Sequence, residues 1–125
     1  MVRRILLTLV LTAATGLSLA GVASAAPGDD VSVANAPCGT SVSDQDGSAW
    51  NTTAETAARQ RSGSSTSCAT NGVLQTADRA DYHCYTWDSI RSATWTYLRN
   101  VRTGVEGWVR DDLLSDSGSR VECVF

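Results

Sequence analysis

Apolar and polar residues alternate in short runs along the second half of the chain, which is the pattern of β-strands that bury one face. In the run 79–86, one face holds Ala80, Tyr82 and Cys84, and the opposite face holds Asp81, His83 and Tyr85. The first face carries the cysteine, and cysteine is among the residue types most often buried. We therefore expect this strand to point its first face into the interior.

A second alternating run, 95–101, places aromatic and aliphatic side chains on opposite faces. Trp95, Tyr97 and Arg99 share one face, and Leu98 lies on the other. The pattern then predicts a turn at 102–104, a strand at 107–109, and a tight turn or short 3₁₀ helix at 111–114. A last predicted strand has one face made of Val121, Cys123 and Phe125.

The composition changes near residue 50, and this divides the chain. From residue 52 to residue 125, short strands broken by Ser, Gly, Asn and Asp clusters indicate one all-β domain. Residues 26–51 are rich in Ala, Pro, Gly, Ser and Asp without a sustained apolar period, so we expect an extended segment whose order the pattern leaves open. Cys38 is its one potential anchor.

The first 25 residues read as a secretory signal peptide. Arg3 and Arg4 form its charged start, residues 5–20 are apolar, and Ala23, Ser24 and Ala25 form a small-residue cleavage site. No later apolar run approaches the roughly 20 residues that span a bilayer. We therefore expect a secreted, extracellular protein that does not insert into the membrane after cleavage.

The charge balance excludes nucleic acid as a partner. The chain holds 10 basic residues, all arginine, and 13 acidic ones in 125 residues, for a formal charge of −3. Without the two arginines of the signal segment the charge is near −5. Nucleic-acid phosphates require a basic face, so this composition argues against DNA and RNA binding.

All four cysteines, Cys38, Cys68, Cys84 and Cys123, follow the predicted cleavage site. An even number of cysteines in a small exported chain implies two disulfides. Four cysteines allow three connectivities, and the sequence does not choose among them. We favour Cys68–Cys84 as a local staple and Cys38–Cys123 as a tie between the two ends.

A series of short motifs runs through residues 53–114. In order they are Arg61-Ser62-Gly63-Ser64-Ser65-Thr66-Ser67, Gly72-Val73-Leu74, Trp95-Thr96-Tyr97-Leu98, Gly104 with Gly107-Trp108-Val109, and Leu113-Leu114. This series resembles the bacterial SH3 (SH3b) domain, as found in small exported proteins of high-GC Gram-positive bacteria. The resemblance implies a small, partly open SH3-like barrel of five or six strands and a peptide of the cell wall as ligand.

Several positions differ from the family pattern. Gln60 stands where the family has an apolar residue, Ser64 where it has Pro, Ala77 where it has Gly, and Ala80 where it has a large aliphatic residue. Loss of large aliphatic side chains removes packing energy. We expect the disulfides to offset part of that loss.

Catalytic and metal-binding patterns are weak in this sequence. His83 is the single histidine, so any triad would have to be built around it and Asp81, and we predict no enzyme. The run 44–47 resembles the middle of a calcium loop, but its frame puts Val42 at position one and Thr53 at position twelve, without the required carboxylates. We expect no metal and no cofactor.

Aromatic residues are the remaining distinctive chemistry, since grooves lined by aromatic rings bind extended peptides. The candidate ligand-binding residues are Trp95, Tyr97, Trp108, Trp87 and Tyr85. The sequence predicts a monomeric, non-catalytic binding module, associated with the cell wall, that recognises peptidoglycan peptides or another extended peptide. The alternative is a secreted inhibitor or interaction factor that acts on an extracellular hydrolase or another protein.

Overall fold

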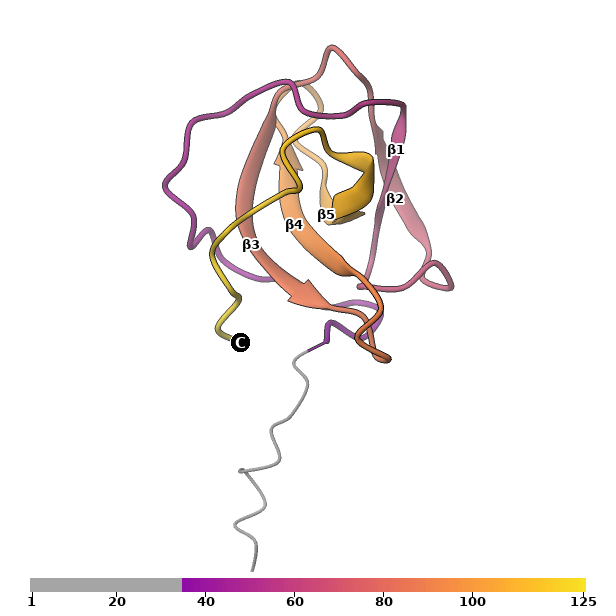
Figure 1. The fold of residues 1–125 in the computed structure, drawn as a ribbon. Coiled ribbons are helices and arrows are strands. Elements are labelled where there is room, and N and C mark those ends of the chain that lie inside the picture. The colour runs from indigo at the N-terminus through magenta and orange to yellow at the C-terminus, as the bar shows by residue number, and fades with distance from the viewer. Residues whose placement is uncertain (1–34) are drawn as a thin grey trace, which may run out of the picture.

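Five antiparallel strands form one curved sheet in the computed structural model, which describes residues 35–125 (Figure 1). The strands are β1 (Ala58–Arg61), β2 (Thr70–Leu74), β3 (Ala80–Trp87), β4 (Thr94–Asn100) and β5 (Glu106–Arg110), followed by the 3₁₀ helix η1 (Asp111–Leu113). Their order in the sheet is β2-β1-β5-β4-β3. Within residues 35–125 no ladder joins β2 to β3, so the barrel is partly open.

The predicted fold class is confirmed: the protein is all-β, with a small five-stranded barrel and two disulfides. The predicted turn before β5 is present, and Gly104 takes the positive φ of 73° that this turn requires. The predicted 3₁₀ piece is η1. The predicted signal segment, 1–25, lies outside the described residues.

Buried side chains form one layer on each face of the sheet. The inner layer fills the barrel and includes Leu74, Leu98 and Val109. The outer layer is aromatic, and contains Trp95, Tyr97 and Trp108 with two of the cysteines. Each large side chain buried in this way contributes roughly 1.5–3 kcal/mol to folding, so both layers stabilise the sheet.

A β-bulge at His83 changes the face on which β3 residues lie. Tyr82 pairs with Leu98 and Cys84 pairs with Tyr97, so His83 is the extra residue of the ladder. As a result Ala80 and Tyr82 belong to the inner layer, whereas Cys84 belongs to the outer one. The prediction that these three share one face is therefore wrong, because strict alternation cannot foresee a bulge.

The N-terminal segment, residues 35–57, runs outside β3 and returns over the top of the barrel to β1 (Figure 1). Ala36 is buried in the outer layer, where Ser64 exchanges hydrogen bonds with it: Ala36 N donates to Ser64 Oγ at 2.9 Å and Ser64 N donates to Ala36 O at 2.8 Å. Ser64 also donates its hydroxyl to Trp87 O at 2.9 Å. Ser64 thus fixes this segment to the barrel.

The disulfides join Cys38 to Cys68 and Cys84 to Cys123. The favoured pairing, Cys68–Cys84 with Cys38–Cys123, is wrong. The first bridge ties the N-terminal segment to the connection between β1 and β2, and the second ties the C-terminal segment to β3. The spacing of the cysteines in the sequence could not predict these pairs, because they depend on how the two flanking segments cross the outer face of the sheet.

The C-terminal segment after η1 crosses β3 without becoming a strand (Figure 1). Tyr85 N donates to Val121 O at 2.7 Å and Cys123 N donates to Tyr85 O at 2.9 Å, which gives an isolated parallel bridge. The predicted strand at 121–125 is therefore wrong, although Cys123 does reach the outer layer. The described residues include no helix with the length and hydropathy needed to cross a membrane.

Candidate functional site

Three of the five predicted ligand-binding aromatics are buried. Trp108 is 0 % exposed, Trp95 3 % and Tyr97 5 %. The N-terminal segment covers them, with Trp108 Nε1 donating to Thr40 O at 2.9 Å, and the ring of Phe125 stacks against Trp108 at 6.4 Å between centroids. The expectation of an exposed aromatic surface at these positions is corrected, because the two flanking segments cover this face of the sheet.

Tyr97 serves as a core residue with a polar end. Its ring packs against Trp108 at 5.0 Å between centroids, and its hydroxyl donates to Glu106 Oε2 at 3.1 Å. Burial and the neighbouring Glu106 charge raise the pKa of Tyr97 to about 12. Tyr85, the fourth candidate, is half-buried under the C-terminal segment.

Trp95 lies at the edge of the outer layer, although only 3 % of its surface is exposed. It lines a groove of about 360 Å³ with Arg59, Arg61, Thr66, Arg110 and Leu113. Trp95 pairs with Arg110 across β4 and β5, and Arg61 pairs with Trp108 across β1 and β5. Directly paired residues lie on the same face of a sheet, so the three strands bring these arginines beside the aromatic layer.

Three arginines and one carboxylate, Asp112, line the groove, so its formal charge is +2 on a chain with a formal charge of −3. Arg61 is held in place by donation from its guanidinium to Cys68 O at 3.0 Å. Arg110 Nε lies 3.0 Å from Asp112 Oδ2, and both side chains are substantially exposed. Arg59 is exposed and forms no ion pair with any described residue. It is therefore free to bind an anionic group.

The indole nitrogen of Trp95 is buried and has no hydrogen-bond partner among residues 35–125. A buried N–H without a partner costs about 1–3 kcal/mol. Its ring forms part of the wall of the groove. The unpaired N–H is itself buried, so the ring contributes apolar wall to the groove.

A second cavity, of about 390 Å³, adjoins the first. Trp87, the fifth predicted residue, lines it together with Thr94 and Asp111, and both cavities share Arg110 and Asp112. The two cavities meet at Arg110 and Asp112, where β5 ends.

Asp111 supplies a buried carboxyl to the second cavity. Burial raises its pKa to about 6, and the Thr96 hydroxyl, which donates to Asp111 Oδ1 at 2.6 Å, opposes that rise. Asp111 is therefore mostly ionised at neutral pH. The second cavity is in consequence less favourable to an anion than the arginine groove.

The arginines of the groove were missed in the sequence. Alternation along β1 puts Arg59 and Arg61 on one face and buried Gln60 on the other, so their shared face was a signal that could have been used. The contribution of Arg110 depends on the pairing of β5 with β4, for which the sequence offered no direct signal.

No family model, no curated protein and no solved structure matches this chain.

Proposed function

We propose that this protein is an exported, non-catalytic binding module of the SH3b type, which holds an extended peptide by a carboxylate in the groove between β1, β4 and β5. The observation that carries the proposal is the gathering of Arg59, Arg61 and Arg110 beside Trp95 on an acidic chain. Peptidoglycan peptides, which carry free carboxylates, are the ligand class that the SH3b resemblance implies.

Arginine suits this role because its planar guanidinium binds a carboxylate through two parallel hydrogen bonds. Arg59 offers such a pair without losing an existing ion pair. Trp95 and Leu113 provide apolar wall for the peptide backbone, and the adjoining cavity at Trp87 has room for the next residues of an extended ligand. The two disulfides support the extracellular setting, since such bonds persist in oxidising compartments.

Co-sedimentation with purified cell-wall sacculi tests the proposal. The native protein is expected to pellet at low salt, and to pellet less as salt screens the arginines. Replacing Arg59 and Arg110 by Gln should weaken pelleting at least tenfold, because both cations face the groove. Arg120→Gln is the matched control, since Arg120 is exposed and lines a different cavity. Absence of pelleting, or equal loss in the control, would reject the proposal.

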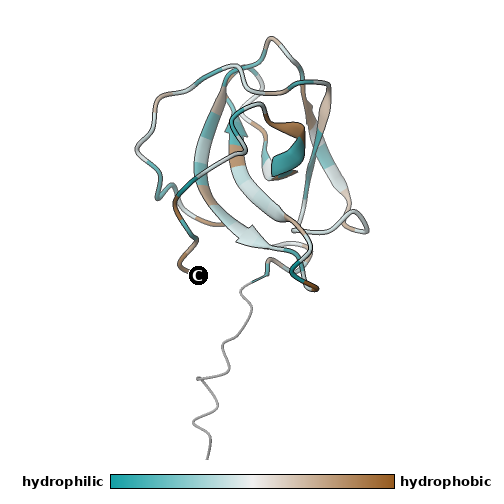
Figure 2. Cartoon of the chain, in the orientation of Figure 1, coloured by the Kyte–Doolittle hydropathy of each residue, from teal (hydrophilic) through white to brown (hydrophobic). Residues whose placement is uncertain are grey.

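The β3–β4 loop supports the alternative function, a secreted inhibitor or interaction factor. It presents Ile90, which is 79 % exposed, and Figure 2 shows the hydrophobic tip of this loop. The Asp88 carboxylate holds the loop by accepting from Ser92 N at 2.7 Å and Ala93 N at 3.1 Å. Burial raises the pKa of Asp88, but the hydrogen bond from the Ser92 hydroxyl, together with those from the loop backbone, outweighs burial and keeps the pKa below its ordinary value.

A hydrogen-bonded loop with an exposed apolar residue resembles the contact loop of a protein inhibitor. In that case Ile90→Ser should abolish inhibition of an exported hydrolase, and Arg59→Gln should leave it unchanged. Failure of the native protein to slow any exported hydrolase removes this alternative.

A further inference from the structure

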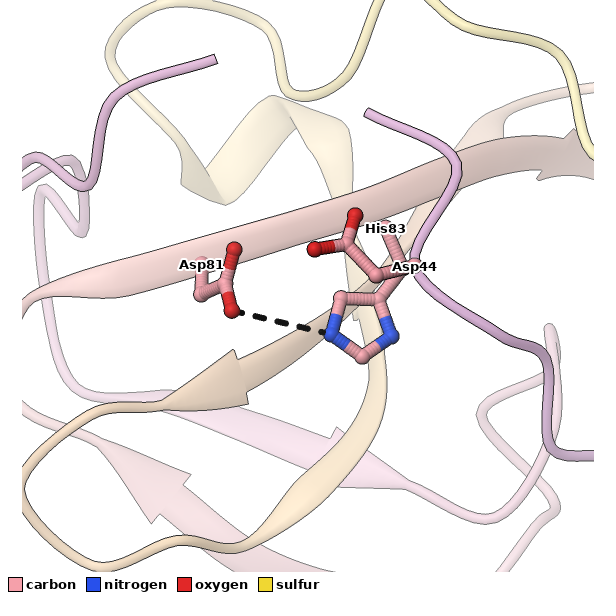
Figure 3. Close-up of side chains that lie close together, drawn as sticks. All are labelled: Asp44, Asp81 and His83. Carbon is pink, nitrogen blue, oxygen red and sulfur yellow. Dashed lines mark ion pairs between the residues drawn. The ribbon is translucent and has the colours of Figure 1, made fainter. Parts of the chain in front are cut away.

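Asp44, Asp81 and His83 converge on the outer side of β3, away from the arginine groove. Each offers one oxygen or nitrogen atom, and the three atoms lie within 4.8 Å of one another. Figure 3 shows Asp81 and His83 on the strand, with the carboxylate of Asp44 beside the imidazole ring from the segment that passes over it. The cluster therefore joins two elements that are 37 to 39 positions apart in the chain.

Alternation along β3 places the His83 imidazole on the outer face, beside Asp81. His83 is the unpaired residue of the ladder, and its ring packs against Tyr97 at 5.5 Å between centroids on the outer face. The bulge adds Cys84 to the same outer face, since Cys84 and not His83 pairs with Tyr97, and bulges are common beside functional sites.

The two ring nitrogens of His83 have different surroundings. Nδ1 lies 3.4 Å from Val42 O, a backbone carbonyl that can only accept, so Nδ1 carries the proton. Nε2 faces Asp81 Oδ2 at 3.9 Å, a distance that is too long for a hydrogen bond but within the range of an ion pair, and the side chain is only 7 % exposed. Nε2 is therefore the ring nitrogen on the side of the Asp81 carboxylate.

We propose that Asp44, Asp81 and His83 bind one divalent transition-metal ion, of which Zn²⁺ is the probe. Imidazole and carboxylate ligands suit zinc, and metal-bound histidine usually donates its other N–H to a carbonyl or carboxylate, as Nδ1 does here to Val42 O. Asp81 has the corresponding support, since Arg99 donates to its Oδ2 at 3.3 Å. The two carboxylates give the cluster a formal charge of −2, of which the Arg99 guanidinium beside Asp81 offsets one, so the cluster attracts a cation.

The present separation of the three atoms is longer than a bound ion requires. Ligands about 2.0–2.2 Å from zinc in a tetrahedral site lie about 3.3 Å from each other. Asp81 and His83 are buried on a paired strand, whereas Asp44 is exposed on a segment without a ladder. Asp44 is therefore the ligand that moves toward the other two when the ion binds. Metal binding then holds the N-terminal segment against β3. Three protein ligands leave a fourth position for water.

Calorimetric titration of the tag-free protein with zinc chloride tests this site. The chain has one histidine, so a polyhistidine tag must be removed and any imidazole signal in an NMR spectrum belongs to His83. We expect one Zn²⁺ per chain, a shift of the His83 ring signals on binding, and a higher melting temperature in excess zinc. Ca²⁺ at the same concentration should produce none of these, because it prefers sites made of oxygen ligands alone.

Asp44→Asn is the decisive variant, since an exposed residue can be changed without disturbing the core. It should weaken zinc binding at least tenfold and leave the amide spectrum of the barrel unchanged. Glu55→Gln, which removes an exposed carboxylate elsewhere, should bind zinc as the native protein does. The proposal is overturned if the native protein shows no saturable zinc binding, if Asp44→Asn binds as tightly as native, or if the His83 signals do not move.

Discussion

Gly63 lies where the N-terminal segment crosses the connection between β1 and β2. A Cβ at this position would be 2.7 Å from Ala36 O and 2.8 Å from Cys38 N. Such distances are well inside van der Waals contact, and the atoms concerned belong to backbone that cannot rotate away. The glycine therefore permits the close approach through which the segment covers the aromatic layer.

Gly63→Ala is expected to destabilise the protein by about 1–3 kcal/mol, because the added methyl pushes the segment away from the barrel. Gly47→Ala is the control, since a Cβ there meets nothing within 4 Å and no positive φ is involved. That change should be neutral or slightly stabilising. Urea unfolding of both variants measures the difference, and equal midpoints would contradict the close packing described for Gly63.

His83 shows what residue-level patterns can and cannot foresee. Its position on the face that carries Asp81 was predicted, and the two do lie together. Asp44 was missed as their neighbour, because nothing local brings residue 44 over β3. The change of face at Cys84 was missed because a bulge has no periodic signal.

Within the elements, the connection between β2 and β3 is fixed to the connection between β4 and β5 through Asp78. Its carboxylate accepts from Arg102 at 2.5 and 3.0 Å, from Asn100 Nδ2 at 2.8 Å and from Gln75 N at 2.9 Å. The Arg102 guanidinium, together with the Gln75 and Asn100 donors, holds the pKa of Asp78 well below its usual range against the effect of burial. A charged network thus stabilises the turn that contains Ala77 and Asp78.

The sign of the pH dependence follows from that lowered pKa. An Asp with a depressed folded pKa stabilises the fold above its unfolded pKa of about 3.9, and this contribution is lost as the pH falls toward the folded value. Stability should therefore decline below about pH 4. Asp78→Asn should cost about 2 kcal/mol at pH 7 and remove part of the acid-side decline. Thermal unfolding from pH 2 to pH 7 measures both effects. An unchanged pH profile in the variant would contradict this role.

The strands β3, β4 and β5 were predicted close to their observed positions, because alternation along a strand is a local property. The C-terminal segment was misassigned because Val121, Cys123 and Phe125 alternate without a partner strand to pair with. Its hydrogen bonds join it to Tyr85, which is far away in the sequence. Alternation along the segment itself therefore could not predict them.

Across the whole molecule, the two disulfides bind the flanking segments onto one outer face. The aromatic layer beneath them would otherwise be a solvent-exposed apolar surface. The sequence predicted the aromatic face but not the two flanking segments that bury it. Local patterns do not show which distant segments pack on a given face. The flanking segments stop covering the sheet at the groove beside Trp95, and arginine side chains line the surface there.

Replacing Cys38 and Cys68 by Ser should destabilise the protein by about 3–4 kcal/mol, since the bridge closes a loop with a sequence separation of 30. The same loss should expose Trp108 and shift tryptophan emission to longer wavelength. Denaturant unfolding and fluorescence measure the two effects. A change below about 1 kcal/mol with unaltered emission would show that the segment packs without its bridge.

The central claim is that the arginine groove binds the carboxylate of a peptide. Its most direct test is an NMR titration with a synthetic peptide of peptidoglycan stem type that carries a free terminal carboxylate. The same peptide, amidated at that end, is the control. The claim predicts saturable shifts of the Arg59, Arg61 and Thr66 amides and of the Trp95 indole. The affinity measured from these shifts should fall at least tenfold when the peptide is amidated and when Arg59 is replaced by Gln. Equal binding of both peptides, or shifts confined to other faces of the barrel, would contradict it.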